Sequence, residues 1–146
     1  MEAALEEAGI AESAGEVPVG AVLLSPNGEI LGRGHNAVIA DSDPTAHAEI
    51  RAIRQAGNAL RNYRMGGALL AVTLEPCLMC VGAMLHARLG GLVFGAFDPK
   101  TGAVSSRLDG FALGGLSSMG QGPWVAGGVL ATECGEILRN FFARRR

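Results

Sequence analysis

Residues 69–80 read Leu-Leu-Ala-Val-Thr-Leu-Glu-Pro-Cys-Leu-Met-Cys, and this stretch decides the fold because it joins a strand directly to a helix. The apolar run Leu69–Leu74 predicts the strand. Proline is favoured in the first turn of a helix, so a helix is predicted over about Pro76–Ala87. Cys77 then falls in its first turn, and Cys80, three residues later, faces the same side.

A second helix start lies upstream, in the run Asp-Pro-Thr-Ala-His-Ala-Glu at residues 43–49. The residue before a proline is biased away from helix, and Thr45 is a good N-cap, so a helix is predicted over about Thr45–Gly57. His47 and Glu49 are two residues apart, roughly 200° around a helix, and cannot share a lateral face. They converge only on a site beyond the helix end, with His47 in the first turn and Glu49 just behind it.

One imidazole and two thiolates suit a catalytic zinc ion, which takes three protein ligands and keeps one position open for water. The positive end of a helix lowers the pKa of a thiol and favours the thiolate that binds metal. Water in the open position acidifies toward a pKa of about 7. Glu49 is the candidate that moves protons between this water and a substrate, so His47, Cys77 and Cys80 are predicted as ligands and Glu49 as the catalytic residue.

Each part of this set has another interpretation. A Cys-x-x-Cys pair also occurs in thioredoxin-like redox proteins, and a lone histidine near an apolar helix is most often packed in a core. A structural zinc site would need a fourth ligand. Neither His35 nor His86, which lies inside the second predicted helix, fits that role. The joint pattern therefore favours an open, catalytic site.

The rest of the chain completes an alternation of helices and strands. Residues 102–128, rich in glycine and serine, predict a loop with one turn of helix, and the apolar stripe of the last helix makes Cys134 a core residue. The order predicts one α/β layered domain over residues 1–146, with a mixed sheet of about five strands. The remaining expected elements are a helix over Met1–Gly15, a hairpin of strands Val17–Leu24 and Glu29–His35, a strand over Gly91–Phe97, a last strand over Trp124–Ala131 and a helix over Thr132–Arg146.

Composition sets the outer limits. Of the 146 residues, 49% are hydrophobic and 18% charged, which is enough for a core and too little charge for a disordered polyelectrolyte. No run approaches the roughly 18 apolar residues of a membrane span, and the acidic N-terminus is unlike a secretory signal, so a cytoplasmic location is expected. Residues 1–50 carry nine acids and one base, whereas residues 51–146 carry five acids and eleven bases. The basic part either faces a polyanion or forms solvated helix faces.

The paired motif His-x-Glu and Pro-Cys-x-x-Cys is the signature of zinc deaminases. Over nearly its whole length the chain resembles one branch of them, the bacterial tRNA-specific adenosine deaminases, which convert adenosine at the anticodon wobble position to inosine. The segment after the fourth predicted strand and the Phe-Phe-Ala-Arg-Arg ending narrow the resemblance to this branch. The matching positions are 15–22, Asn36, 43–50, 74–80, 94–103 and 141–145.

The resemblance implies a three-layer α/β/α fold of the cytidine-deaminase type, one Zn²⁺ per subunit, a homodimer and the tRNA anticodon stem-loop as partner. It implies that Asn36 hydrogen-bonds the flipped base and that Asp98 and Lys100 lie near the RNA backbone. Asn36 could instead close a turn, and Asp98-Pro99-Lys100 could be an ordinary polar turn. The chain departs from the family at residues 116–124, where it lacks the Asn-His pair of close relatives.

Two further assignments stay open. Trp124 either stacks on a base or, as we favour, is a buried anchor of the last strand, and the helix Val81–Leu89 is either an interface or core. Three rival functions also remain: a deaminase of free guanine, cytosine or cytidine, a zinc-bearing RNA-binding module, and a thiol redox protein.

Overall fold

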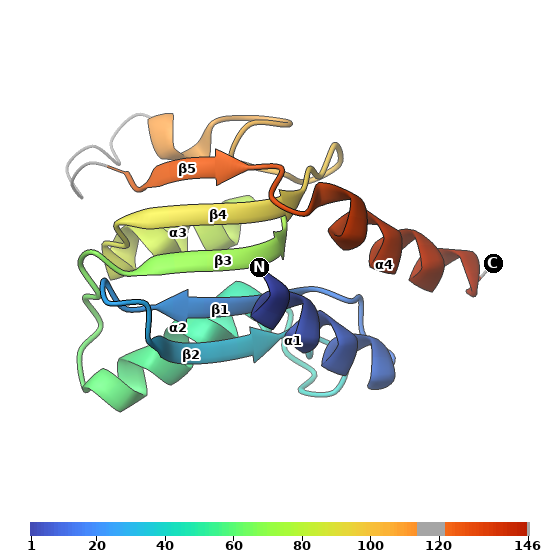
Figure 1. Ribbon diagram of the computed structural model, residues 1–146, viewed down its shortest axis with the longest axis horizontal. Coiled ribbons are helices and arrows are strands. Elements are labelled where there is room, and N and C mark those ends of the chain that lie inside the picture. The colour runs from blue at the N-terminus through green and yellow to red at the C-terminus, as the bar shows by residue number, and fades with distance from the viewer. Residues whose placement is uncertain (114–121, 146) are drawn as a thin grey trace.

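A mixed five-stranded sheet in the order β2-β1-β3-β4-β5 forms the centre of the computed structural model, which describes residues 1–113 and 122–145 (Figure 1). Strand β1 pairs antiparallel with β2 and β3, whereas β3, β4 and β5 run parallel. The strands are β1 Gly20–Leu24, β2 Ile30–His35, β3 Leu69–Leu74, β4 Gly91–Ala96 and β5 Trp124–Gly127. The carboxyl ends of the parallel strands lie at the same end of the sheet, and α/β proteins bind their ligands just beyond these strand ends.

Helices cover both faces of this sheet, which confirms the predicted three-layer arrangement. Helices α2 (Ala48–Leu60) and α3 (Leu78–Ala87) lie behind the sheet in Figure 1, and α1 (Glu2–Ser13) lies on the side toward the viewer. Helix α4 (Ala131–Ala143) packs against β4 and extends to the right beyond the strand ends. The single turn of helix expected in the Gly-rich region is η1, Gly110–Ala112. No helix in the described part of the chain is long and apolar enough to cross a membrane.

The main core lies between the sheet and the pair α2 and α3. It includes Leu70, Val72, Leu92 and Phe94 from the strands. Val81, Met84, Leu85, Ala87 and Leu89 are all buried in the same cluster, so the helix whose role the sequence left open is core on that side. The other side of α3 exposes Leu78 and Met79.

Two glycines of β2 set the position of α2. A Cβ on Gly34 would lie 2.2 Å from the carbonyl oxygen of Ala48, and one on Gly32 would lie 2.3 Å from that of Ala52. Only glycine allows the helix backbone to approach the strand this closely. The first turn of α2 is therefore held directly against the sheet.

The predicted helix starts are wrong by one to three residues. Helix α2 begins at Ala48 with His47 as its N-cap, because both the backbone N–H and the hydroxyl of Thr45 donate to Asp43 (2.8 and 2.7 Å). Thr45 is thus not the cap. Helix α3 likewise begins at Leu78, which makes Cys77 its N-cap rather than part of its first turn.

Strand ends also differ from the predicted bounds. Strand β1 begins at Gly20 rather than Val17, because the N–H of Val19 donates to the Val17 carbonyl in a tight turn (2.8 Å). Strand β5 ends at Gly127 rather than Ala131, since Gly128 (φ 85°) turns the chain. Smaller shifts of one to three residues occur at the ends of α1, α2, β2, β4 and α4.

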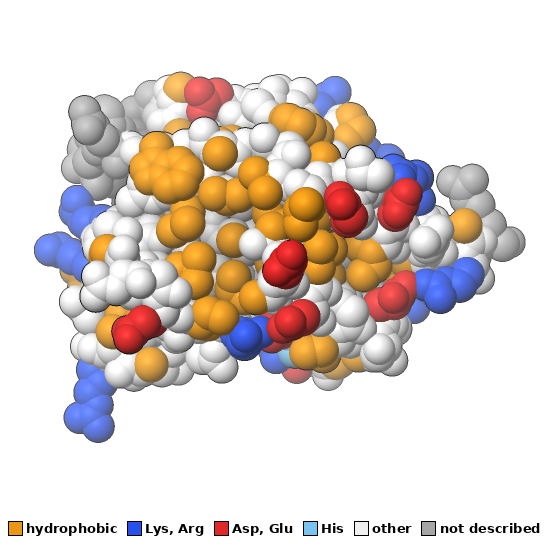
Figure 2. Space-filling model, viewed as in Figure 1, with side chains coloured by type: hydrophobic (Ala, Val, Ile, Leu, Met, Phe, Trp, Pro, Cys, Tyr) orange, Lys and Arg blue, Asp and Glu red, His pale blue; other side chains and the backbone are white. Residues whose placement is uncertain are grey.

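The prediction that Trp124 is a buried anchor is wrong. Strand β5 is the sheet edge, and the indole of Trp124 rests over Gly91 while 57% of the residue stays exposed. Apolar side chains gather over β3, β4 and β5 on the face that Figure 2 presents to the viewer. In α4, Cys134 is buried as predicted; Phe141 is buried as well, whereas Phe142 is exposed.

Candidate active site

Three side chains of types that can bind a metal ion meet where α2 and α3 begin. His47 is the N-cap of α2, Cys77 is the N-cap of α3, and Cys80 lies one turn further along α3. The His47 Nδ1 atom lies 3.7 Å from each sulfur, and the two sulfurs lie 3.8 Å apart. The fold thus brings together the three residues that the sequence predicts as ligands, and this set of His47, Cys77 and Cys80 is called the metal group below.

These distances fit zinc. With Zn–S near 2.3 Å and Zn–N near 2.0–2.1 Å, tetrahedral angles separate the donor atoms by about 3.5–3.8 Å. Among the described residues, His47, Cys77 and Cys80 form the one group of three or more such side chains with ligand atoms this close together. Within the described part of the chain, the group contains three protein ligands and no fourth. Three protein ligands are typical of a catalytic zinc site, whereas a structural site has four.

The charge state of the two thiols depends on their contact. Hydrogen bonding to Cys80 lowers the pKa of the Cys77 thiol to about 4, against the opposing effect of burial. The same contact, together with burial, raises the pKa of Cys80. The hydrogen bond to Cys77 also raises the pKa of His47. A metal ion must therefore displace protons from this group, so its binding weakens as the pH falls.

Glu49 lies in the first turn of α2, two residues after His47, and only 4% of it is exposed. Its carboxyl group interacts with Cys80, which places it beside the three ligands. Burial raises the pKa of Glu49. A carboxyl group whose pKa moves toward neutrality is suited to accepting and returning a proton.

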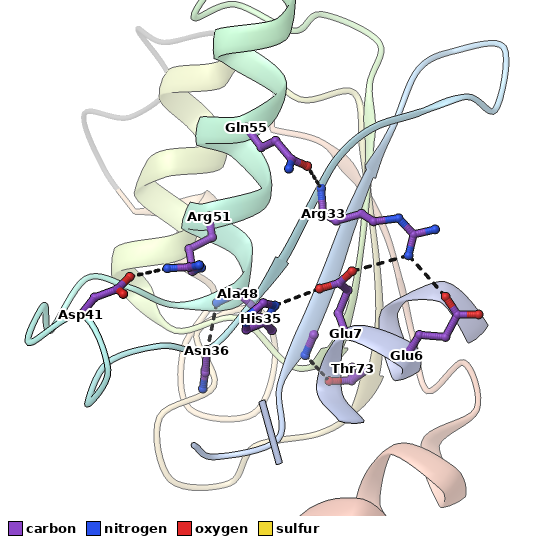
Figure 3. Close-up of polar contacts among 11 residues, drawn as sticks. Glu6, Glu7, Arg33, His35, Asn36, Asp41, Ala48, Arg51, Gln55 and Thr73 are labelled. Carbon is purple, nitrogen blue, oxygen red and sulfur yellow. Dashed lines mark hydrogen bonds and ion pairs between the residues drawn. The ribbon is translucent and has the colours of Figure 1, made fainter. Parts of the chain in front are cut away.

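Asn36 closes the start of α2 in the way that Thr45 was expected to. Its Oδ1 accepts a hydrogen bond from the Ala48 N–H at 2.9 Å (Figure 3). This contact corresponds to the turn-closing role that the sequence left open. Because the oxygen is used in this way, the NH₂ group is the end of the Asn36 side chain that can donate to a base.

His35, the nearest competitor as a ligand, is occupied elsewhere. Its Nδ1 lies 2.9 Å from the carboxylate of Glu7, which is nearly buried and also pairs with Arg33 (Figure 3). These contacts join α1 to β2. His35 therefore belongs to the scaffold and not to the metal group.

Asp98 and Lys100 lie in the loop after β4, with the Lys100 residue exposed. Asp98 accepts hydrogen bonds from the Lys100 N–H (2.9 Å) and the Thr101 hydroxyl (2.6 Å). The segment is thus a polar turn. It is also close to the metal group, because Cys77 forms an antiparallel bridge with Gly102.

Glu75 is the residue whose role the sequence did not reveal. It is 2% exposed and its carboxylate receives backbone N–H donors from residues 98 and 104–106. Burial acts to raise its pKa, but the hydrogen bonds from Ser106, Ser105 and Asp98 outweigh it and hold the pKa at about 2. The one available signal was a glutamate beside Pro-Cys followed downstream by a run of small residues.

Comparison with known proteins agrees with this geometry. Residues 1–96 match the model of the cytidine and deoxycytidylate deaminase zinc-binding region. The tRNA-specific adenosine deaminase of Haemophilus influenzae is 51% identical over 146 residues, which cover 100% of this chain and 83% of that protein. That of Bacillus subtilis is 44% identical over 146 residues and 88% of its length. A structure solved in a study of A-to-I editing by tRNA:A34 deaminases has a TM-score of 0.88 and 45% identity, over 94% of this chain and 97% of that one.

Proposed function

The chain belongs to the cytidine and deoxycytidylate deaminase family, within it to the tRNA-specific adenosine deaminases, and from this premise we propose that it converts adenosine to inosine at the wobble position of a tRNA anticodon. The reaction consumes one water and releases one ammonia. The observation that carries the proposal is the close triangle of His47, Cys77 and Cys80 with the buried carboxyl group of Glu49 beside it.

In this proposal His47, Cys77 and Cys80 hold one zinc ion per chain. Zinc, when bound, supplies the Lewis acidity that activates water as a nucleophile near neutral pH. The fold supports this assignment by placing the two N-cap residues and Cys80 at two converging helix starts, where the helix dipoles favour thiolates. Cys134, the third cysteine, is buried against β4 and takes no part.

Glu49 moves the protons. It accepts a proton from the water that attacks C6 of adenine and donates one to N1. Glu49 next takes the proton of the new C6 hydroxyl group and delivers it to the amino nitrogen, so that the C6 carbonyl forms as the C–N bond breaks and ammonia leaves. Burial of the carboxyl group and the resulting rise in its pKa support this use of one side chain as both base and acid.

The substrate contacts are assigned to Asn36, Asp98 and Lys100. Asn36 donates its NH₂ group to the flipped base, since its oxygen already caps α2. Asp98 and Lys100 face the RNA backbone from the loop beside the metal group. An anticodon loop offers unstacked bases, which reduces the energy needed to extrude one of them.

We further propose that residues 1–146 form one deaminase domain that works as a homodimer on the anticodon stem-loop. The exposed apolar residues Leu78 and Met79 in the first turn of α3 support an interface there. A cytoplasmic location is part of the same proposal, supported by the free cysteines and by the tRNA substrate. The loop that lacks the Asn-His pair falls mostly on residues 114–121, outside the described residues.

The test offers the zinc-loaded protein a set of substrates. These are stem-loop RNA with adenosine at the wobble position, the same RNA with adenosine only elsewhere in the loop, and free guanine, cytosine and cytidine. Inosine confined to the first RNA is the expected result. Ammonia released only from a free base or nucleoside would assign the protein to the other deaminases of the family, and RNA binding without ammonia would reject catalysis.

A further inference from the structure

The loop of residues 98–106, here the 98–106 loop, wraps around one buried carboxylate. Glu75 Oε2 accepts the backbone N–H of Asp98 at 3.0 Å, and Oε1 accepts those of Val104, Ser105 and Ser106 at 3.2, 2.8 and 2.9 Å. The Ser106 hydroxyl also donates to Oε2. A Cβ on Gly102 would lie 2.5 Å from the carboxyl group, so the loop backbone is closed tightly around it.

This arrangement requires an acceptor that offers no donor. Backbone N–H groups can only donate, and an ionised carboxylate can only accept, with about four lone-pair sites. A glutamine at the same position would turn its NH₂ group toward N–H donors and leave some of them unsatisfied. The loop conformation therefore depends on the charge of Glu75 and not merely on its shape.

The same loop is tied to the metal-ligand segment through the backbone. The Ala103 N–H donates to the Pro76 carbonyl at 2.8 Å, and Gly102 forms the bridge with Cys77. These two contacts stay in place without the Glu75 side chain. The carboxylate adds the contacts at the two ends of the loop, at residue 98 and at residues 104–106, so its loss loosens the loop ends more than the ligands.

We propose that Glu75 is a positioning residue for the substrate: it holds the 98–106 loop in the shape that presents Asp98 and Lys100 to the RNA, without touching RNA or metal. The inference rests on the proposed function, which places Asp98 and Lys100 against the RNA backbone. It assigns Glu75 to substrate binding and not to the chemical step.

The experiment compares the zinc-loaded wild type with Glu75→Gln. Three quantities are measured: zinc content, hydrogen exchange of the amides at Asp98 and at residues 104–106, and binding and turnover of stem-loop RNA with adenosine at the wobble position. We expect unchanged zinc, faster exchange at these four amides, and a rise of about tenfold or more in both Kd and KM, the order expected when a hydrogen bond to a charged group is lost. We expect kcat to change less than about threefold.

Two further variants sharpen the result. Glu16 is another buried carboxylate, 3% exposed, that accepts two backbone N–H groups, from Ile39 and Ala40. Glu16→Gln therefore serves as the matched control and should leave exchange in the 98–106 loop unchanged. Ser106→Ala removes one donor to Glu75 and should shift exchange and Kd in the same direction by a smaller factor, which keeps the test open if Glu75→Gln does not fold.

Several outcomes would overturn the inference. Loss of zinc from Glu75→Gln would mean that the carboxylate positions the ligands. Unchanged amide exchange would mean that the loop does not depend on the charge, and faster exchange with unchanged Kd would mean that the loop does not serve the RNA. If the wild type binds this RNA without deaminating it, the proposed function fails, while exchange and Kd still decide the role of Glu75.

Discussion

Glu49 is buried beside Cys80 in the first turn of α2, and the proposed function makes it the residue that moves protons. Glu49→Gln keeps the shape of the side chain but cannot carry a proton. We expect the rate of inosine formation to fall by about 10²–10⁴, with the zinc content unchanged. Single-turnover assays with metal analysis provide the measurement, and Glu133→Gln on α4 is the exposed control. Near-normal turnover would remove Glu49 from its assigned role.

The three cysteines differ in their expected sensitivity to substitution. Cys77→Ala removes one of three ligands, so the purified variant should lose its zinc. The Cys134 side chain packs over Gly95 and is not one of the three candidate ligands, so Cys134→Ala should keep its zinc. Zinc measured per chain in the two purified variants distinguishes these cases. Equal zinc in both would contradict the assignment of Cys77.

Glu75 makes the free energy of unfolding depend on pH. The ordinary pKa of a glutamate is 4.5. In the folded protein burial acts to raise the pKa of Glu75, but hydrogen bonds to the carboxylate outweigh burial and lower the pKa to about 2. Because the folded pKa is the lower one, the stabilisation is complete above about pH 5 and is lost as the pH falls from there toward 2, on the order of 3 kcal/mol in total. Urea unfolding of the wild type and of Glu75→Gln between about pH 6 and 3 measures this stabilisation. Both proteins lose zinc as the pH falls, so the difference between their free energies of unfolding reports the Glu75 carboxylate. A stability difference that does not shrink with falling pH would refute it.

At this scale the sequence was informative where function is tied to residue type. Histidine and paired cysteines have few uses at such spacing, so the ligand group could be predicted and the structure brings its members together. The role of Glu75 could not be predicted, because most of its donors are backbone amides of a distant loop, which any residue type supplies. Asn36 was predicted to contact a base, and its contact with Ala48 depends on where a helix begins.

Among the elements, the contact of α2 with β2 controls the site most directly. Gly34→Ala would place a Cβ 2.2 Å from the Ala48 carbonyl and force the first turn of α2 away from the strand. We expect a loss of about 1–3 kcal/mol in the free energy of unfolding and weaker zinc binding. Gly82→Ala on α3 is the matched control, since a Cβ there meets nothing within 4 Å. Thermal or denaturant unfolding and a zinc competition titration measure both effects.

The free energy of unfolding of Gly82→Ala is the standard against which Gly34→Ala is judged. An alanine in the interior of α3 should leave stability unchanged or raise it by up to about 1 kcal/mol, because alanine has the higher helix propensity. If Gly34→Ala were as harmless as Gly82→Ala, the strand would not position the helix start.

Element type was predictable from sequence, and element ends were less so. Strand β3 has the predicted bounds because its apolar run is flanked by clear breaks, whereas α2 begins later than predicted because Asp43 takes both donors of Thr45. Trp124 was expected to be a buried anchor of the last strand. Its exposure follows from the place of β5 at the sheet edge, which depends on strand order.

For the whole molecule, the sequence predicted a mixed sheet of about five strands but not their order. The order β2-β1-β3-β4-β5 arises from the antiparallel pairing of β1 with β3 and the parallel pairing of β3 with β4, contacts between residues far apart in the chain. That order brings the ends of β3 and β4 together, and with them Glu75, Cys77 and the 98–106 loop. The site is thus a product of topology as well as of motif.

The most direct test of zinc-dependent hydrolysis is the mass of the inosine formed in ¹⁸O-labelled water. The zinc-loaded protein is incubated with stem-loop RNA carrying adenosine at the wobble position, beside protein whose zinc has been removed with a chelator. We expect one ¹⁸O atom in each inosine base, one ammonia per inosine, and activity that disappears with the metal and returns when zinc is added. Inosine without ¹⁸O, or equal activity in the zinc-free protein, would contradict the account.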